Sequence, residues 1–175
     1  MTQNLKAHML IFIATILIAF SFIISVKISG LINPTSLTLL RFVLAFTVLL
    51  PFILLSKKYR DKIKQSFFKG LKISLFYSLY FILLFKALEY TSALNTSTLF
   101  TLVPLLTAIF ASFIFNDKLN ILKLAIYLLG MIGTVIVIFD GSLEAIIKLT
   151  FNSGDIIFLF AVVSMGIYSI SAKYF

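Results

Sequence analysis

The sequence contains no cysteine and has little charge: only 12% of its 175 residues are Asp, Glu, Lys or Arg, and six are acidic. Without cysteine there is no disulfide framework, no thiolate nucleophile and no cysteine metal site. Histidine occurs once, at the start of an apolar run, where a bystander role is expected rather than a ligand. These absences remove most of the usual means of enzyme chemistry.

Recognisable catalytic motifs are also missing. The chain has no His-Glu-x-x-His, no Gly-x-Ser-x-Gly and no pair of acids inside an apolar segment. We therefore predict that the protein is not an enzyme and uses no metal and no cofactor.

Apolar residues are abundant, at 61% of the chain, and the mean hydropathy is +1.14. This composition belongs to membrane proteins. The net charge of +9 could suggest nucleic-acid binding, but seven of the fifteen basic residues lie between Lys57 and Lys72 and most others flank apolar runs. That distribution is typical of loops on the cytoplasmic side, which also contact anionic lipid. We expect a lipid bilayer as partner, and no nucleic acid.

The segment from Leu94 to Asn116 is the clearest sign of a membrane span. Its 23 residues include no charge and twelve Leu, Ile, Val or Phe, and about 20 apolar residues cross a bilayer. Pro104 near its middle cannot donate to the carbonyl of Phe100, so we expect this helix to kink.

Further apolar runs predict an all-α, polytopic bundle of about six transmembrane helices. The expected helices are Ala7–Val26, a second one capped by Thr35 or Ser36 and ending near Ser56, Ile73–Tyr90, Leu94–Asn116, Ile121–Phe139 and Ile156–Ala172. A very short turn predicts a tight hairpin between the third and fourth helices. Gly130 and Gly133 predict close helix packing in the fifth.

The charge distribution predicts that the amino terminus is cytoplasmic. In that orientation eleven of the fifteen basic residues lie inside, including the Lys57–Lys72 segment. Four of the six acids, Glu89, Asp140, Glu144 and Asp155, then lie at the outer side.

Charged residues near the spans give the first candidate sites. Arg41 is expected about 9 Å into the second helix, where an arginine costs up to roughly 2.5–3.5 kcal/mol. Two interpretations remain open: the side chain extends to the headgroups, or it faces a polar cavity. Lys86 and Glu89 are three residues apart and are expected to pair.

A weak internal similarity relates the first and last helices. Residues 14–22 and 161–169 have comparable patterns of small and apolar residues, and each is followed by Ser-x-Lys. Five helices would separate the two copies, so the second would be inverted in the membrane, as in many secondary transporters.

Several short motifs together resemble the EamA-type members of the drug/metabolite transporter superfamily. The matching residues are Ser21-Phe22, Lys27, Pro34, Leu40-Arg41-Phe42, Ala87-Leu88-Glu89-Tyr90-Thr91-Ser92-Ala93, Pro104-Leu105, Asn116-Asp117-Lys118-Leu119, Gly133 and Gly154-Asp155. The chain departs from the family pattern in two places. Asn116-Asp117-Lys118-Leu119 stands where Gly-Glu-Arg-Leu is usual, and Ile18-Ala19 where Trp-Gly is usual.

The resemblance implies a protein of two five-helix repeats, whereas this sequence holds one repeat and one further helix. We expect residues 7–140 to form the repeat, 141–155 an extracytoplasmic linker, and 156–175 the first helix of a second repeat. The sequence is then truncated, or it pairs with a second copy or another chain. In either case the final helix lacks an obvious packing role.

The resemblance implies transport of a small metabolite or drug-like solute across the cytoplasmic membrane by alternating access. The expected path residues are Arg41, Tyr77, Tyr80, Thr98, Thr101 and Pro104, with Arg41 compensating an anionic group and the tyrosines forming a wall. Alternatives are a truncated protein without transport activity and a subunit similar to the small multidrug exporters, acting as a dimer. The exporters rely on a carboxylate in the first helix, and this chain has none there.

Overall fold

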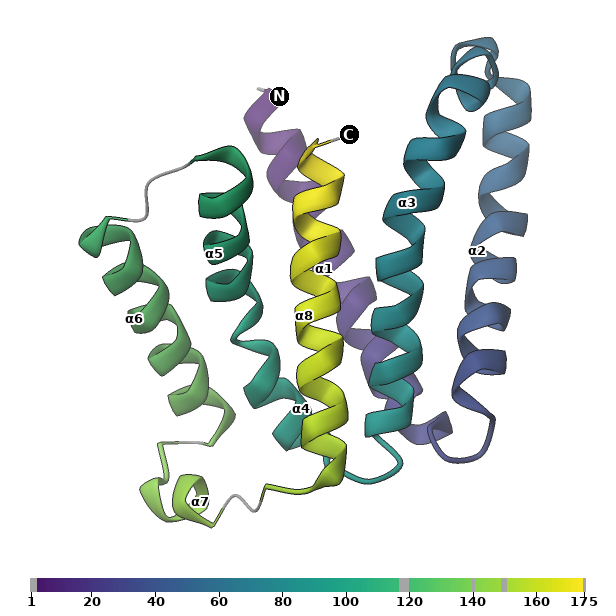
Figure 1. Ribbon diagram of the computed structural model, residues 1–175. Helices are drawn as coiled ribbons and strands as arrows, with labels where there is room; N and C mark the ends of the chain where they lie inside the picture. The colour runs from purple at the N-terminus through teal and green to yellow at the C-terminus, as the bar shows by residue number, and fades with distance from the viewer. Residues whose placement is uncertain (1–2, 117–119, 140, 149–150, 175) are drawn as a thin grey trace.

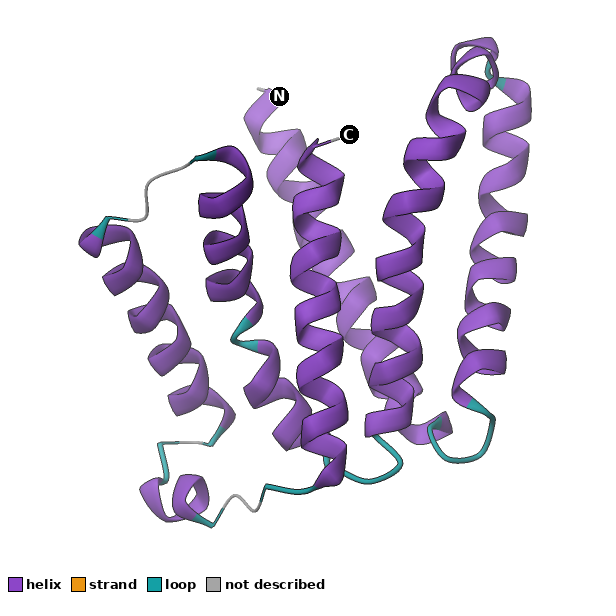
Figure 2. Cartoon of the chain, viewed as in Figure 1, coloured by secondary structure: helices purple, strands orange, loops and turns teal. Residues whose placement is uncertain are grey.

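The computed structural model describes residues 3–116, 120–139, 141–148 and 151–174, which form helices with short connections and no strand (Figure 1, Figure 2). The helices are α1 (Gln3–Ile28), α2 (Pro34–Leu55), α3 (Lys57–Ala87), α4 (Ala93–Phe100), α5 (Val103–Phe115), α6 (Ile121–Ile138), α7 (Leu143–Ile147) and α8 (Ser153–Tyr174).

Five segments of the described chain are long and apolar enough to cross a membrane. They are Leu5–Ile28, Pro34–Leu55, Ser66–Ala87, Ala93–Phe115 and Ser153–Tyr174, with a shorter apolar helix at Ile121–Ile136. The predicted polytopic helical bundle is therefore confirmed. The division into units at residues 140 and 155 stays a prediction, although α8 begins at Ser153, earlier than expected.

The start of α2 differs from the predicted cap. The side-chain oxygen of Asn33 accepts a hydrogen bond from the Thr35 N–H at 3.0 Å, and Pro34 is the first helical residue. Proline suits this position because its fixed φ matches the helix and its missing N–H needs no partner. Thr35 and Ser36 thus lie inside α2, and the prediction that one of them caps it was wrong.

The basic segment is helical rather than a loop. Only Ser56 separates α2 from α3, which begins at Lys57 and ends at Ala87, not at Tyr90. Lysine, arginine and glutamine are good helix formers, and no glycine or proline interrupts residues 57–69. The predicted start at Ile73 was wrong because hydropathy detects the apolar part of a helix and misses its polar extension.

The predicted kink at Pro104 is confirmed as a break between two helices. α4 ends at Phe100 and α5 begins at Val103, with Thr101 and Leu102 in a turn. Pro104 lies at the start of α5, where its missing N–H is tolerated.

The last helix, α8, is the centre of the bundle. It packs along α3 on one side and against α4 and α5 on the other (Figure 1). In its most apolar stretch 39% of residues are buried, against 6–11% in the other four long spans. The expectation that this helix lacks a packing role was wrong for this structure. The predicted α3–α4 hairpin was also wrong, because α8 lies between the two helices.

Close packing occurs at other glycines than those predicted. A Cβ added to Gly130 or Gly133 would meet nothing within 4 Å, whereas one on Gly154 would lie 2.8 Å from the Ala87 carbonyl oxygen. A Cβ on Gly166 would lie 3.0 Å from the Phe110 ring. Glycines therefore allow close approach of neighbouring helices along α8 and not along α6.

Candidate functional site

Arg41 lies where α2 faces α1. Its Nη1 donates to Ser25 Oγ and its Nη2 to Ser21 Oγ, both at 2.6 Å. The two serines are four residues apart and therefore share one face of α1. The Ser25 hydroxyl donates to the Ser21 carbonyl at 2.6 Å, so its lone pairs stay available to the guanidinium. The side chain is thus held between α1 and α2 and is partly buried. Its role toward a ligand stays a prediction.

Aromatic rings of α3 cover the same guanidinium. Its Cζ lies 4.7 Å from the centre of the Phe81 ring and 5.5 Å from that of Phe85. A cation over an aromatic face gains about 0.5–2 kcal/mol, the larger figure where water is excluded. Hydroxyls and rings therefore stabilise the charge without a carboxylate.

A cavity of about 420 Å³ opens beside Arg41. This volume falls within the range of about 300–1,000 Å³ found for small-molecule sites. Five helices supply its walls: Leu17, Ile18, Ser21, Phe22 and Ser25 from α1, Arg41 from α2, Tyr77, Tyr80, Phe81 and Leu84 from α3, Phe100 from α4 and Met165 from α8. We call this cavity the Arg41 pocket.

The tyrosines of the Arg41 pocket have defined neighbours. Tyr77 stacks on Tyr168 of α8, with ring centres 4.6 Å apart, and Tyr80 lies 6.0 Å from Phe100. Within the described chain, the hydroxyls of Tyr77 and Tyr80 form no side-chain hydrogen bond. The aromatic residues of α3 therefore both pack the bundle and line the cavity.

The acidic residues of the described chain lie away from Arg41. Glu89 pairs with Lys86 at 2.6 Å, as predicted, and Glu144 pairs with Lys148 at 2.5 Å. Asp155 is bound by polar groups of α4 and of the α3–α4 connection. Asp61 is exposed near the start of α3. None of these four carboxylates forms an ion pair with Arg41.

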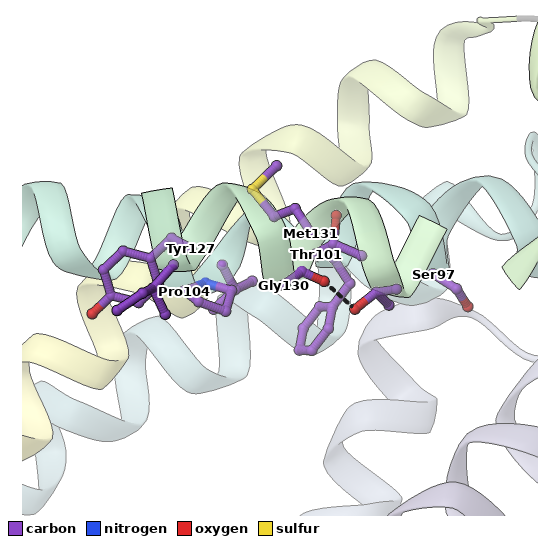
Figure 3. Close-up of a pocket in the computed structure, with 10 residues that line it drawn as sticks. Ser97, Thr101, Pro104, Tyr127, Gly130 and Met131 are labelled. Carbon is purple, nitrogen blue, oxygen red and sulfur yellow. Dashed lines mark hydrogen bonds between the residues drawn. The ribbon is translucent and has the colours of Figure 1, made fainter. Parts of the chain in front are cut away.

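The other candidate residues lie away from Arg41. Thr101 and Pro104 line a second cavity of about 410 Å³ between the α4–α5 break and α6, which also exposes Ser97, Tyr127, Gly130 and Met131 (Figure 3). The Thr134 hydroxyl, also in this wall, donates to the Gly130 carbonyl at 2.8 Å. Thr98 lines neither cavity, and its hydroxyl donates to the Leu94 carbonyl at 2.9 Å. The six predicted path residues therefore divide into Arg41, Tyr77 and Tyr80 at one cavity, Thr101 and Pro104 at another, and Thr98 outside both.

The family motif after α3 contacts the start of α8. The Thr91 hydroxyl donates to Asp155 Oδ1 at 2.5 Å, and the Asn95 amide donates to both carboxylate oxygens at 3.1–3.2 Å. The Asn152 N–H donates to Oδ2 at 2.8 Å. Asp155 is only 1% exposed, so these bonds replace its hydration. We call these four residues the Asp155 cluster.

The remaining motif residues take part in packing, helix capping or ion pairing. Ala87 is fully buried against Gly154, Leu88 caps the end of α3, and Lys86 lies 5.0 Å from the centre of the Tyr90 ring as well as pairing with Glu89. Asp117 and Lys118 lie outside the described residues.

The hydrogen-bond partners of Arg41 and Asp155 were not predicted from the sequence. Ser21 belongs to the matching family motif and Ser25 only to the Ser-x-Lys similarity, and neither was assigned a role, although their i, i+4 spacing was a usable signal. Asp155 was expected at the outer side, and Asn95 was not considered. Polar residues at helix ends suggest solvent exposure in a sequence, and only the packing of α8 buries them.

The chain belongs to the EamA-like transporter family, whose model matches residues 5–139. It is also similar to an "Uncharacterized transporter YyaM" of Bacillus subtilis (strain 168), with 30% identity over 156 residues. That match covers 83% of this chain and 48% of the relative, so the chain spans about half the length of the curated relative it matches. No solved structure matches the chain. Family membership identifies a multi-pass membrane protein of a transporter family rather than an enzyme.

Proposed function

We propose that the chain forms all or part of a pathway by which a small metabolite or drug-like solute crosses the cytoplasmic membrane through alternating access. The observation that carries the proposal is the Arg41 pocket, where five helices meet around a charged side chain. Charged groups retained inside membrane bundles generally serve ligands, ions or voltage. The pocket would hold the solute in the middle of its path.

Energetics favour a binding role for Arg41 over simple anchoring. An arginine costs up to roughly 2.5–3.5 kcal/mol at the centre of a bilayer and less toward its edge, whereas an apolar residue could pack at the position of Arg41 without that cost. Arg41 also holds α1 beside α2 through Ser21 and Ser25. Binding of a solute to Arg41 could therefore change the position of α1 relative to α2.

The second cavity lies at the break between α4 and α5, and we propose that the helices move at this break during transport. Discontinuous helices commonly border transport sites, because unwound backbone is tolerated where it lines a cavity. Thr98, Thr101 and Pro104 lie on or beside such a break, and we propose them as residues of the path there. We also propose that a second copy, or a chain supplying the other half, completes the path.

An Arg41→Ala variant tests the proposal. The chain is reconstituted in liposomes and exposed to a panel of radiolabelled amino acids, organic acids, organic cations, nucleosides and sugars. At least one solute is expected to move through the unaltered protein and through Arg60→Ala, which changes the other arginine at the exposed start of α3. Arg41→Ala should abolish that movement at equal protein content. Equal movement with Arg41→Ala would remove Arg41 from the path.

A further inference from the structure

We infer that the Arg41 pocket selects a small monocarboxylate with a flat, mostly apolar body, such as an aromatic acid. This inference rests on the proposed transport function and narrows its substrate class. Three features of the pocket carry it: its charge, its free hydrogen-bond donors and the chemistry of its walls.

The charge of the pocket favours a single negative charge. Arg41 is the one charged side chain among its described lining residues, and the described acids bind elsewhere. A guanidinium has five N–H donors in a planar arrangement that matches a carboxylate. Two of these donors bind Ser21 and Ser25, and the other three form no hydrogen bond with the described residues.

A dianion fits this pocket poorly. Among the described residues of this chain, no second cationic side chain lines the cavity, so the second charge of a phosphate ester would lie against hydrocarbon without a partner. Burying an uncompensated charge is strongly unfavourable. The tyrosine hydroxyls could donate to the second oxygen of a carboxylate, but they carry no positive charge.

The walls define the rest of the ligand. Apart from Arg41 and the two serines, the lining is formed by rings and aliphatic groups, including Tyr77, Tyr80, Phe100 and Met165. Flat apolar groups gain from offset or edge-to-face contacts with such rings. The two tyrosine hydroxyls of these walls could bond only part of a polar body such as a sugar, whose other hydroxyls would lie against rings and aliphatic groups without partners.

Direct binding to the purified 175-residue chain tests the inference. Radiolabelled phenylacetate is the probe, and binding is measured on immobilised protein because weak acids also cross lipid unaided. Four unlabelled competitors each change one property. Phenylacetamide removes the charge, phenethylamine reverses it, acetate removes the ring, and phenyl phosphate adds a second charge. Unlabelled phenylacetate is expected to displace the probe at concentrations at least about tenfold lower than any of the four. The loss of one charge-assisted hydrogen bond accounts for roughly that ratio with phenylacetamide and phenethylamine. The loss of ring contacts weakens acetate, and the uncompensated second charge weakens phenyl phosphate.

Variants place the binding at Arg41. Arg41→Gln keeps a polar N–H group but removes the charge and shortens the side chain. It should weaken phenylacetate binding by about tenfold or more, whereas the same change in Arg60→Gln should leave binding unchanged. Arg41→Lys keeps the charge but not the planar donors and should bind with intermediate affinity. If Arg41→Gln fails to fold, the competition series on the unaltered protein decides the question.

The outcomes separate this inference from the transport proposal. Absence of phenylacetate binding, equal competition by phenylacetamide, or unchanged binding in folded Arg41→Gln would each overturn the substrate class. Transport of a neutral or cationic solute that depends on Arg41 would also overturn it, while supporting transport itself. Failure of every solute in the liposome panel to move would instead contradict the proposed function.

Discussion

At the scale of single residues, the Asp155 cluster fixes where α8 meets the rest of the chain. Asp155 is almost fully buried, yet its carboxylate is bound only by hydroxyl and amide groups of Thr91, Asn95 and Asn152 among the described residues. Charge-assisted bonds of this kind are stronger than neutral ones. They tie the α3–α4 connection and the start of α4 to α8 across 60 or more residues of sequence.

Asp155→Asn should destabilise the protein by about 1–3 kcal/mol. An asparagine replaces one acceptor oxygen by an NH₂ group, which leaves at least one buried donor without its partner. The measurement is the midpoint of thermal unfolding in a mild detergent. Asp61→Asn, which makes the same change at an exposed position near the start of α3, should leave the midpoint unchanged. Equal midpoints for both variants would mean that the cluster contributes little.

Gly154→Ala should destabilise the protein by a comparable amount. The added methyl group would lie 2.8 Å from the Ala87 carbonyl oxygen and from the Thr91 N and Cβ, so α8 would have to shift. Overpacking of this kind costs typically 1–3 kcal/mol.

Gly133→Ala is the matched control, because nothing lies within 4 Å of the added atom and alanine favours the helix over glycine by up to about 1 kcal/mol. The same unfolding assay should show Gly133→Ala at or above the stability of the unaltered protein. A Gly154→Ala midpoint that matches this control would contradict the close contact.

At the scale of elements, the break between α4 and α5 separates one membrane span into two helices. The carbonyl of Phe100 loses its usual donor because Pro104 has no N–H. The two halves meet at the second cavity, beside α6 (Figure 3). Thr101 and Leu102 form the turn between them and keep bonds to Thr98 and Leu99.

Pro104→Ala should straighten this span. The new N–H can donate to the Phe100 carbonyl and join α4 to α5 as one helix, which lengthens the distance between its ends. Spin labels on cysteines replacing the exposed Leu94 and Phe113 would report that distance by pulsed electron spin resonance. Pro51→Ala should not change it, because α2 already runs unbroken through Pro51. An unchanged distance in Pro104→Ala would place the cause of the break elsewhere.

The positions of the helices in the chain were largely predictable from the sequence, whereas the contacts between helices were not. Long apolar runs are set by composition, so the spans, the kink at Pro104 and the position of Arg41 inside a helix could all be derived. Which helices touch depends on packing. The central place of α8 rests on Gly154, Gly166 and Ser164, whose hydroxyl donates to the Phe76 carbonyl at 2.9 Å. Each of these is an ordinary small residue in the sequence. For the same reason the spacing of Ser21 and Ser25 is compatible with one helix face but could not identify Arg41 as the partner of both.

At the scale of the whole molecule, the helix ends divide into two groups. The amino end of α1, the α2–α3 connection, the amino end of α6 and the carboxyl end of α8 lie at one end of the bundle (Figure 1). These segments carry most of the described basic residues, including the Lys57–Lys72 segment and Lys173. The α3–α4 connection and α7 lie at the opposite end. The positive-inside rule therefore supports the proposed cytoplasmic amino terminus.

Single cysteines at the two ends test this orientation directly, because the natural chain has none to remove. Tyr59→Cys lies in the basic segment and Leu143→Cys in α7, and both native side chains are more than half exposed, at 57% and 74%. An impermeant maleimide should label Leu143→Cys on intact cells and Tyr59→Cys only after the membrane is opened. The reverse pattern would place the basic segment outside. Since the ends at one side of the bundle must share a compartment, it would invert the proposed orientation of the whole chain.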